Sequence, residues 1–381
     1  MGRIRTKSGK VITSKPSPAT VVKEEPSTQS LLSKAQSLIT QCNYELSQKF
    51  IRRILERDPH HVDARELLGI TQLEMGELED AKKTFQSLLS PTRSTVVPAS
   101  AHLYLAQLSD EDPNLALKHY EAAVGILHNQ LKGKERADAP TDADDSEESE
   151  ADIRKNIVKV LVAMVEIWMA PTYDLCFDPK AEETCENLLK TAFETDSNNI
   201  DALICLSSFR LSQQKPEEAK QAAIQAWSVW KDEEDESKIP AISSRIELTK
   251  RFLEVQEYAA ALHVLQTIMA TDDQDVEAWY LEGWCFYLMA EQAKETNTKI
   301  EELSWEELAK DSRDCLENCR SLHTNLEHPD DKLLEHTIEL IGQLDSLGIK
   351  PTPEEEQQED DGDEWEDLPD DEDGDGDIDM S

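Results

Sequence analysis

Three residues of types that bind metal ions recur every four positions near the end of the chain. They are Cys315, Cys319 and His323. Residues four apart lie on one face of a helix, so the three could coordinate an ion such as zinc, with His328 or His336 as a fourth ligand. The same spacing is typical of a stripe of packing residues. We favour packing, and the sequence predicts no metal site here.

A calcium-binding pattern begins in the stretch DEDGDGDID, residues 371–379. Asp371, Asp373 and Asp375 match the first, third and fifth positions of an EF-hand loop, and Gly376 matches the sixth. The bidentate glutamate of the twelfth position would fall at 382, after Ser381, and the pattern predicts no flanking helices. The stretch is therefore interpreted as an acidic segment that binds cations loosely.

Catalytic motifs are not found in the sequence. It contains no nucleophile elbow, phosphate-binding loop, zinc-protease helix or paired-glycine fingerprint. The nine histidines have no partner at a spacing that indicates acid–base work. We predict a protein that is not an enzyme and that uses no cofactor.

The composition favours a binding protein with a basic partner. The 381 residues carry 39 basic and 80 acidic side chains, a formal net charge of −41. Such a charge disfavours nucleic acid as the main ligand and complements a basic protein.

No apolar run is long enough to span a bilayer, and no leader is predicted. Seven cysteines scattered through apolar patterns predict reduced thiols, and hence a location in cytoplasm and nucleus.

Composition also divides the chain into segments. Residues 1–27 form a basic arm that is predicted to be disordered; it could target the nucleus, and MGRIRT formally fits a myristoylation pattern, but we favour a plain flexible arm. Residues 133–152 are expected to form a disordered acidic loop, and residues 291–308 to lengthen one helical hairpin. Residues 351–381 are expected to be a disordered acidic tail, with seventeen acids and no Lys or Arg between 354 and 379.

One phrase is repeated along the body of the chain. DPHHVDARELLG begins at 58, DSNNIDALICLS at 196 and DDQDVEAWYLEG at 272, at spacings close to whole multiples of a unit of about 35 residues. Leu68, Gly69, Ala81 and Phe85 match positions of the tetratricopeptide repeat, a pair of antiparallel helices. We predict an all-α solenoid of about six to seven helix pairs: repeats one to three over 28–132, then repeats four to seven and a capping helix over 153–350.

In this fold the first helix of each pair lines the concave surface, so the residues at repeat positions 2, 5, 9 and 12 are candidates for partner binding. The predicted groove is apolar, with acids and aromatics, although any single apolar member is more often a packing residue. The candidate client-binding residues are Asp63, Glu66, Ile70, Leu73, Met164, Ile204, Leu211, Glu277, Tyr280, Trp284 and Tyr287. The same numbering places Ile157, Val160, Ile167, Asp201 and Ser208 on this surface.

The stretch from 181 to 222, with DGDEWEDLPDDEDGD near the end, resembles the assembly-chaperone family dedicated to the large-subunit ribosomal protein uL-four. The order of basic arm, repeat array with acidic insertion and acidic tail is also similar to that family. The resemblance implies a chaperone that captures uL-four soon after synthesis and escorts it to the nucleus for pre-ribosome assembly. It also implies that the concave surface holds the client's long internal loop.

Two other classes of function stay open at this point. A tetratricopeptide scaffold or adaptor of a multi-subunit complex would have the same fold, and histone chaperones also use acidic tails. A dedicated chaperone should recover one basic client, whereas a scaffold should recover several acidic or neutral partners together. An additional import factor is a possible partner of the chaperone; no nucleic acid or membrane partner is predicted.

Overall fold

The computed structural model describes residues 26–89, 97–135, 149–233 and 235–352. The predictions made for residues 1–25, for most of the acidic loop and for the acidic tail fall outside the described residues. The chain divides into two compact units between Asn129 and Gln130, and each is described by itself. In the described part, regular structure is helical apart from one isolated bridge between Ile300 and Leu303.

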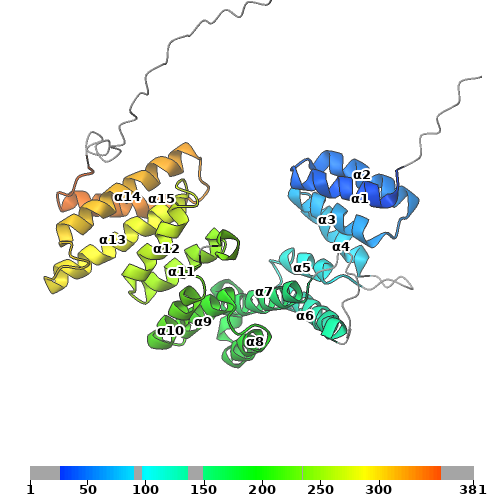
Figure 1. Ribbon diagram of the computed structural model, residues 1–381, viewed down its shortest axis with the longest axis horizontal. Coiled ribbons are helices and arrows are strands. Elements are labelled where there is room, and N and C mark those ends of the chain that lie inside the picture. The colour runs from blue at the N-terminus through cyan, green and yellow to red at the C-terminus, as the bar shows by residue number, and fades with distance from the viewer. Residues whose placement is uncertain (1–25, 90–96, 136–148, 234, 353–381) are drawn as a thin grey trace, which may run out of the picture. The chain divides into compact units, whose positions relative to one another are not determined.

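The N-terminal unit contains three helix pairs (Figure 1). The pairs are α1 (Thr28–Thr40) with α2 (Tyr44–Arg57), α3 (Val62–Glu74) with α4 (Leu78–Leu88), and α5 (Ala99–Gln107) with α6 (Pro113–Glu135), the last of which runs past the division between units. Helix α3 contacts both α2 and α1, so the second pair stacks on the first. This stacking is typical of repeat arrays.

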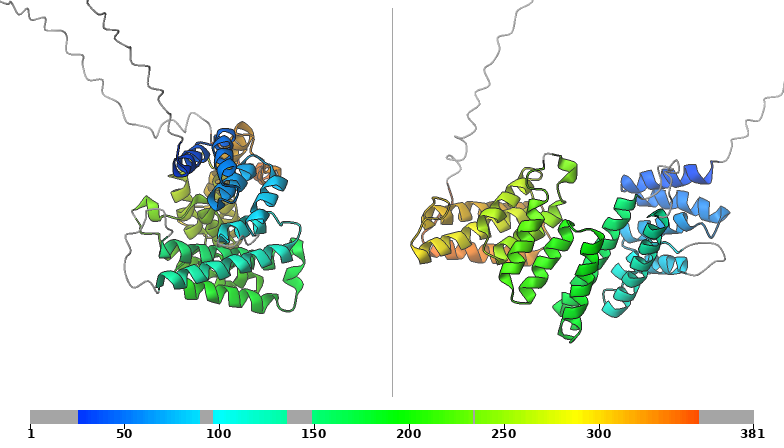
Figure 2. Two further views of the ribbon diagram at one scale, coloured as in Figure 1. Left: turned by 90° about the vertical axis from the view of Figure 1, so that its right-hand side faces the viewer. Right: turned by 60° about the horizontal axis from the view of Figure 1, so that its bottom comes forward.

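The C-terminal unit contains four further pairs and a capping helix (Figures 1 and 2). They are α7 (Glu150–Met169) with α8 (Ala181–Thr195), α9 (Ile200–Ser212) with α10 (Pro216–Ser228), α11 (Ile242–Glu254) with α12 (Tyr258–Met269), and α13 (Val276–Thr296) with α14 (Trp305–Asn325). Helix α15 (Asp331–Ser346) is the cap. Short 3₁₀ turns lie between α7 and α8 (Pro171–Tyr173 and Leu175–Phe177) and before α11 (Glu236–Lys238). The segment 291–308 extends the last pair, whose helices have 21 residues each.

The repeated phrase of the sequence builds the same start for α3, α9 and α13. In α9 the Asp196 carboxylate accepts from the backbone N–H of Asn198 (3.2 Å), which closes a turn, and the Asn199 side chain accepts from Ala202 N–H (3.1 Å) as the N-cap. The equivalent caps are His61 for α3 and Asp275 for α13. Because each cap fixes where its helix begins, it also fixes which residues face the concave side.

Small residues let the two helices of a pair approach closely. The Ser207 hydroxyl donates to the carbonyl of Ala219 across the α9–α10 pair (2.9 Å), and the Ser312 hydroxyl donates to the carbonyl of Gly283 across α13–α14 (2.7 Å). Ser207, Ser312 and Ala219 are fully buried. A buried hydroxyl with a partner costs little, so these positions select Gly, Ala and Ser.

The C-terminal segment after α15 turns back onto α14. The guanidinium of Arg313, 8% exposed, pairs with Glu317 (3.0 Å) and Asp345 (2.5 Å) and donates to the carbonyl of Ile349 (3.2 Å). Just beyond, the backbone N–H of Thr352 donates to Asp314 (2.8 Å). These contacts fix the end of the described chain against α14.

Candidate functional site

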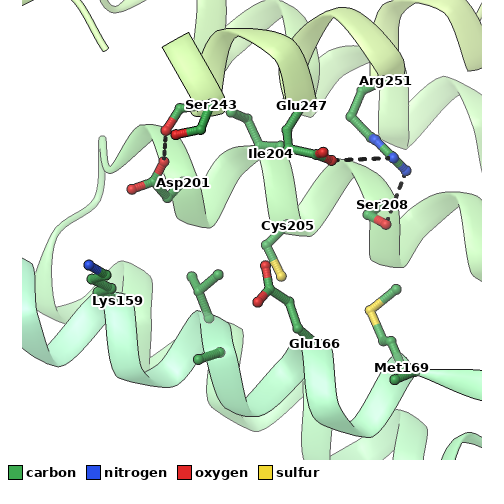
Figure 3. A pocket seen from close by; sticks show the side chains of 14 residues that line it. Lys159, Glu166, Met169, Asp201, Ile204, Cys205, Ser208, Ser243, Glu247 and Arg251 are labelled. Atoms are coloured by element: carbon green, nitrogen blue, oxygen red, sulfur yellow. Dashed lines mark hydrogen bonds and ion pairs between the residues drawn. The ribbon is translucent and has the colours of Figure 1, made fainter. Parts of the chain in front are cut away.

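The first helices of three successive pairs in the C-terminal unit enclose an open hollow of about 560 Å³ (Figure 3). We call it the α7–α9–α11 hollow. Its lining combines aliphatic, sulfur-containing, acidic and basic side chains. The lining residues are Lys159, Val162, Ala163, Glu166, Met169, Ala170, Asp201, Ile204, Cys205, Ser208, Ser243, Ser244, Glu247 and Arg251.

Three carboxylates from three different helices face this hollow, and they differ in their partners. Asp201 of α9 accepts from the Ser244 hydroxyl (2.8 Å). Glu247 of α11 pairs with Lys250 (2.7 Å). The Glu166 carboxylate projects from α7 toward Cys205 and has no hydrogen-bond or ion-pair partner among the described residues (Figure 3).

The electrostatics of the hollow follow from this arrangement. Burial raises the pKa of Glu166, and the nearby charges of Glu247 and Asp201 raise it further. Arg251 also lines the hollow (Figure 3): it pairs with Glu254 (3.0 Å) and Glu247 (3.7 Å) and donates to the Ser208 hydroxyl (3.2 Å). Three acids outnumber two bases, Lys159 and Arg251, in the lining, so the hollow favours a positively charged ligand.

A second feature of the same unit is the aromatic patch, which we define as Tyr280, Trp284 and Tyr287 of α13. The rings of Tyr280 and Trp284 lie 5.9 Å apart, and each lies 5.7 Å from the imidazole of His336 on α15. Tyr280 Oη and His336 Nδ1 are 2.8 Å apart, and Tyr287 Oη donates to Gln343 (2.5 Å). The capping helix thus covers one side of the patch and leaves its three side chains half-buried.

Glu277, in the first turn of the same helix, forms an ion pair with a neighbouring helix. Its carboxylate pairs with Lys250 of α11 (2.8 Å), which also pairs with Glu247. Lys250 therefore joins the edge of the hollow to the edge of the aromatic patch. Leu211, the remaining candidate on α9, is half-buried and lies outside the lining of the hollow.

In the N-terminal unit the candidates lie on α3. Asp63 is exposed, and Glu66, Ile70 and Leu73 are half-buried. Ile70 and Leu73 pack against the cluster that contains Phe85. Burial raises the pKa of Glu66, a hydrogen bond with Ser100 of α5 lowers it, and Asp63 raises it. This surface therefore combines two acids, Asp63 and Glu66, with two half-buried apolar residues, Ile70 and Leu73.

One helix departs from the predicted groove register. Met164 is 5% exposed, and Ile157 and Val160 are buried as well, so these three candidates on α7 pack into the core; the fourth, Ile167, is half-buried. Met164 does not line the hollow, and its role in client binding stays a prediction. The side chains that α7 contributes to the hollow are Lys159, Val162, Ala163, Glu166 and Met169. The numbering is a poor guide here because apolar residues lie all around α7 and no repeated cap phrase precedes it.

On α9 the predicted positions Asp201, Ile204 and Ser208 all line the hollow. Sequence reasoning missed Glu166, Glu247 and Arg251. A signal for Glu166 was present, because it is the only charged residue in the stretch from Val160 to Met169. A charge inside a helix that is otherwise apolar usually faces a groove or a partner.

The cysteines and histidine considered as metal ligands have other contacts. Cys319 and Thr337 lie 3.7 Å apart and are both buried, and the imidazole Nε2 of His323 is 2.9 Å from the carbonyl of Asp330. Burial raises the pKa of Cys319 to about 11, which opposes formation of a metal-binding thiolate. Among the described residues, no group of three or more metal-ligating side chains is placed to hold an ion.

Comparison with known proteins is consistent with the geometry. A family model described as tetratricopeptide repeat matches residues 38–95. The chain is 31% identical over 301 residues to a "Probable assembly chaperone of rpl4" from Schizosaccharomyces pombe, covering 78% of this chain and 84% of the relative. It is 28% identical over 312 residues to a protein of the same name from Emericella nidulans, covering 78% and 74%.

Among solved structures, "Assembly Chaperone of RpL4 (Acl4) (Residues 1-338)" matches with a TM-score of 0.61 at 26% identity, covering 71% of this chain and 100% of that one. The helix pairs and their stacking define a tetratricopeptide-repeat protein. Within that class, the chain belongs to the family of assembly chaperones of rpl4. Assembly chaperones are not enzymes. Within the described residues, no helix is both long and apolar enough to cross a bilayer.

Proposed function

We propose that the chain is a dedicated chaperone of the ribosomal protein for which its relatives are named, rpl4, called uL-four above. It binds the newly made protein, keeps it soluble and escorts it to pre-ribosome assembly in the nucleus. Binding occurs between the client's extended, basic internal loop and the concave face of the repeats. Family membership supports the client, and the net charge of −41 supports a basic one.

The observation that carries this proposal is the α7–α9–α11 hollow. Acids from three first helices face one space whose walls are partly apolar. An extended basic segment has cationic heads on aliphatic stems, and this surface is complementary to both parts. The aromatic patch supplies a further contact area, because aromatic side chains dominate binding hot spots.

The remaining concave residues extend the proposed surface within each unit. In the N-terminal unit we include Asp63, Glu66, Ile70 and Leu73. In the C-terminal unit we include Ile204, Leu211, Glu277 and the aromatic patch. We leave out Met164 because its side chain is buried and, unlike Ile204, does not line the hollow.

Affinity purification of the tagged chain tests the client directly. We expect one basic ribosomal protein at equal stoichiometry, with recovery that falls as salt rises, because charge attraction is screened. Recovery of several acidic or neutral proteins together would instead indicate a scaffold. Recovery of histones would indicate a histone chaperone.

A matched pair of variants tests the surface. The double variant Asp201→Asn, Glu247→Gln removes two acids from the hollow, and Glu183→Gln, Glu194→Gln removes two exposed acids from α8. Both variants change the net charge equally, so general electrostatic attraction is matched. We expect the first variant alone to weaken client binding. Equal weakening by both would contradict binding on the concave face.

Nuclear escort requires a separate measurement. Pulse-labelled client should reach the nucleus more slowly in cells that lack the chaperone. An unchanged nuclear fraction, with reduced client solubility in the cytoplasm, would limit the role to protection after synthesis.

A further inference from the structure

The α7–α9–α11 hollow contains an acid whose charge is not compensated within the described chain. Glu247 is paired with Lys250, and Asp201 accepts a hydrogen bond from Ser244. The carboxylate of Glu166, an exposed residue, has neither an ion pair nor a hydrogen bond there, and it faces both of these acids across the hollow (Figure 3). Both oxygens of such a carboxylate can accept hydrogen bonds from a ligand.

The walls beside this acid are apolar. Ile204 and Cys205 of α9, which are 7% and 6% exposed, and Met169 of α7 line the same hollow. A long cationic side chain can lay its methylene groups along such walls while its charged head reaches the acids. The volume of about 560 Å³ accommodates a side chain of this size.

We propose that the hollow binds the side chain of an arginine from the client, with the Glu166 carboxylate accepting from its guanidinium and the walls of Ile204 and Met169 holding its stem. This inference rests on the proposed function. It identifies an arginine side chain as the part of the client that binds in the hollow.

Arginine fits the geometry better than lysine. The three carboxylates reach the hollow from α7, α9 and α11, and so from different directions. A guanidinium presents five N–H donors in a planar fork, which can serve acceptors on several sides, whereas an ammonium is a compact point charge. An anionic side chain would meet three acids and is excluded by repulsion.

The basic residues of the hollow do not satisfy Glu166. Arg251 is occupied by Glu254, by Glu247 and by the Ser208 hydroxyl (Figure 3). Lys159 lies at the opposite end of the hollow from Arg251, below Asp201 (Figure 3). Glu247 and Asp201 raise the pKa of Glu166, and a bound guanidinium would offset that repulsion.

The first test uses Glu166→Gln in the full chain with the recombinant client. We expect affinity to fall about tenfold, since the amide keeps the shape but loses a charge-assisted hydrogen bond. Glu194→Gln on α8 is the matched control, because Glu194 is exposed, pairs only with Lys190 (3.9 Å) among the described residues and lies outside the hollow. Equal affinity of wild type and Glu166→Gln would overturn the inference while leaving the proposed function intact.

The second test does not depend on the client. N-acetyl-arginine methylamide is titrated into the full chain while the methyl signals of Met169 and Ile204 are followed by NMR, with the citrulline analogue as the uncharged control. Arginine-specific shifts that disappear in Glu166→Gln support the site even if the ribosomal protein fails to bind, which would refute only the proposed function. Identical responses to both analogues, or none, would overturn the arginine site.

Discussion

The ring of Phe85 on α4 lies directly against the backbone of Gly69 on α3. A β-carbon added at residue 69 would come within 2.5 Å of the Phe85 Cζ atom, a separation that real side chains do not show. Phe85 is fully buried and stacks on Tyr104 of α5, with ring centroids 4.6 Å apart. The absence of a side chain at 69 therefore allows both the α3–α4 pair and its contact with the next pair.

We expect Gly69→Ala to destabilise the N-terminal unit by about 1–3 kcal/mol, because the methyl group must displace a ring held on both sides. Thermal denaturation followed by circular dichroism measures the loss. The control is Gly125→Ala in α6, where a β-carbon meets nothing within 4 Å, so the better helix propensity of alanine should stabilise slightly. A neutral effect at 69 would show that the Phe85 ring can move away.

Residues with left-handed backbone angles follow the first helices of several pairs, among them Cys42 after α1, and of those in the described residues only Gly76 is glycine. Gly76 has φ of 75°, while Gln214 and Gln256 occupy equivalent turns with φ of 59° and 61°. A side chain in this conformation costs about 1 kcal/mol, so Gln256→Gly should raise stability by roughly that amount. Gln266→Gly, at an exposed position inside α12, should lower stability by about as much. Chemical denaturation distinguishes the two, and a loss of stability at 256 would contradict the argument.

Removal of Arg313 should loosen the cap. The guanidinium is almost fully buried and joins Glu317, Asp345 and the Ile349 carbonyl, so Arg313→Ala leaves these groups without their shared donor. We expect a cost of about 2 kcal/mol in urea denaturation, less than for a fully buried pair because Asp345 can be solvated. Arg320→Ala removes an exposed guanidinium that pairs with the same Glu317 and should cost less than about 1 kcal/mol. If both variants lost the same free energy of unfolding, the burial of Arg313 would contribute nothing to stability.

The raised pKa of Glu166 predicts how the stability of the C-terminal unit depends on pH. Between the usual value, 4.5, and the raised folded value, the folded chain binds more protons than the unfolded chain. Stability contributed by this group is thus present at low pH and lost as pH rises through the folded pKa. Glu166→Gln should therefore be more stable than wild type at neutral pH, with a difference that shrinks as pH falls toward 4. Melting temperatures across this range test it, and a difference that grows on acidification would refute it.

The outcome for Glu166→Gln also separates binding from folding. A variant that is at least as stable as wild type and still binds the client less well has lost a contact, not its fold. Such opposition between stability and binding is common at functional sites.

The fold was predicted well from the sequence where short motifs encode a turn or a helix cap. The stretch that starts at 196 encodes a turn and a cap, so the start of α9 was fixed and Asp201, Ile204 and Ser208 were assigned to positions that line the hollow. The same reasoning places α3 and α13. Local signals of this kind act within a few residues and need no knowledge of the partner helices.

The register of α7 could not be predicted in the same way. Its apolar residues from Ile157 to Met169 surround the helix, so periodicity alone leaves the orientation undetermined. The orientation is set by contacts with α8 on one side and α9 on the other, which are distant in sequence. The contact between the capping helix and the aromatic patch could not be predicted either. It depends on His336 and Gln343, which lie 56 residues after Tyr280 and Tyr287, their respective partners.

The caps that open α3, α9 and α13 have a consequence for how this family can change over time. Each residue of a helix advances about 100° around its axis. One amino acid inserted after Asn199 would rotate every later side chain of α9 by that angle. Residues that now line the concave surface would then point away from it. One inserted ahead of Asp196 would only lengthen a connection. New client preferences are thus expected to arise by replacement of side chains within α9, while changes of length are tolerated between the helices.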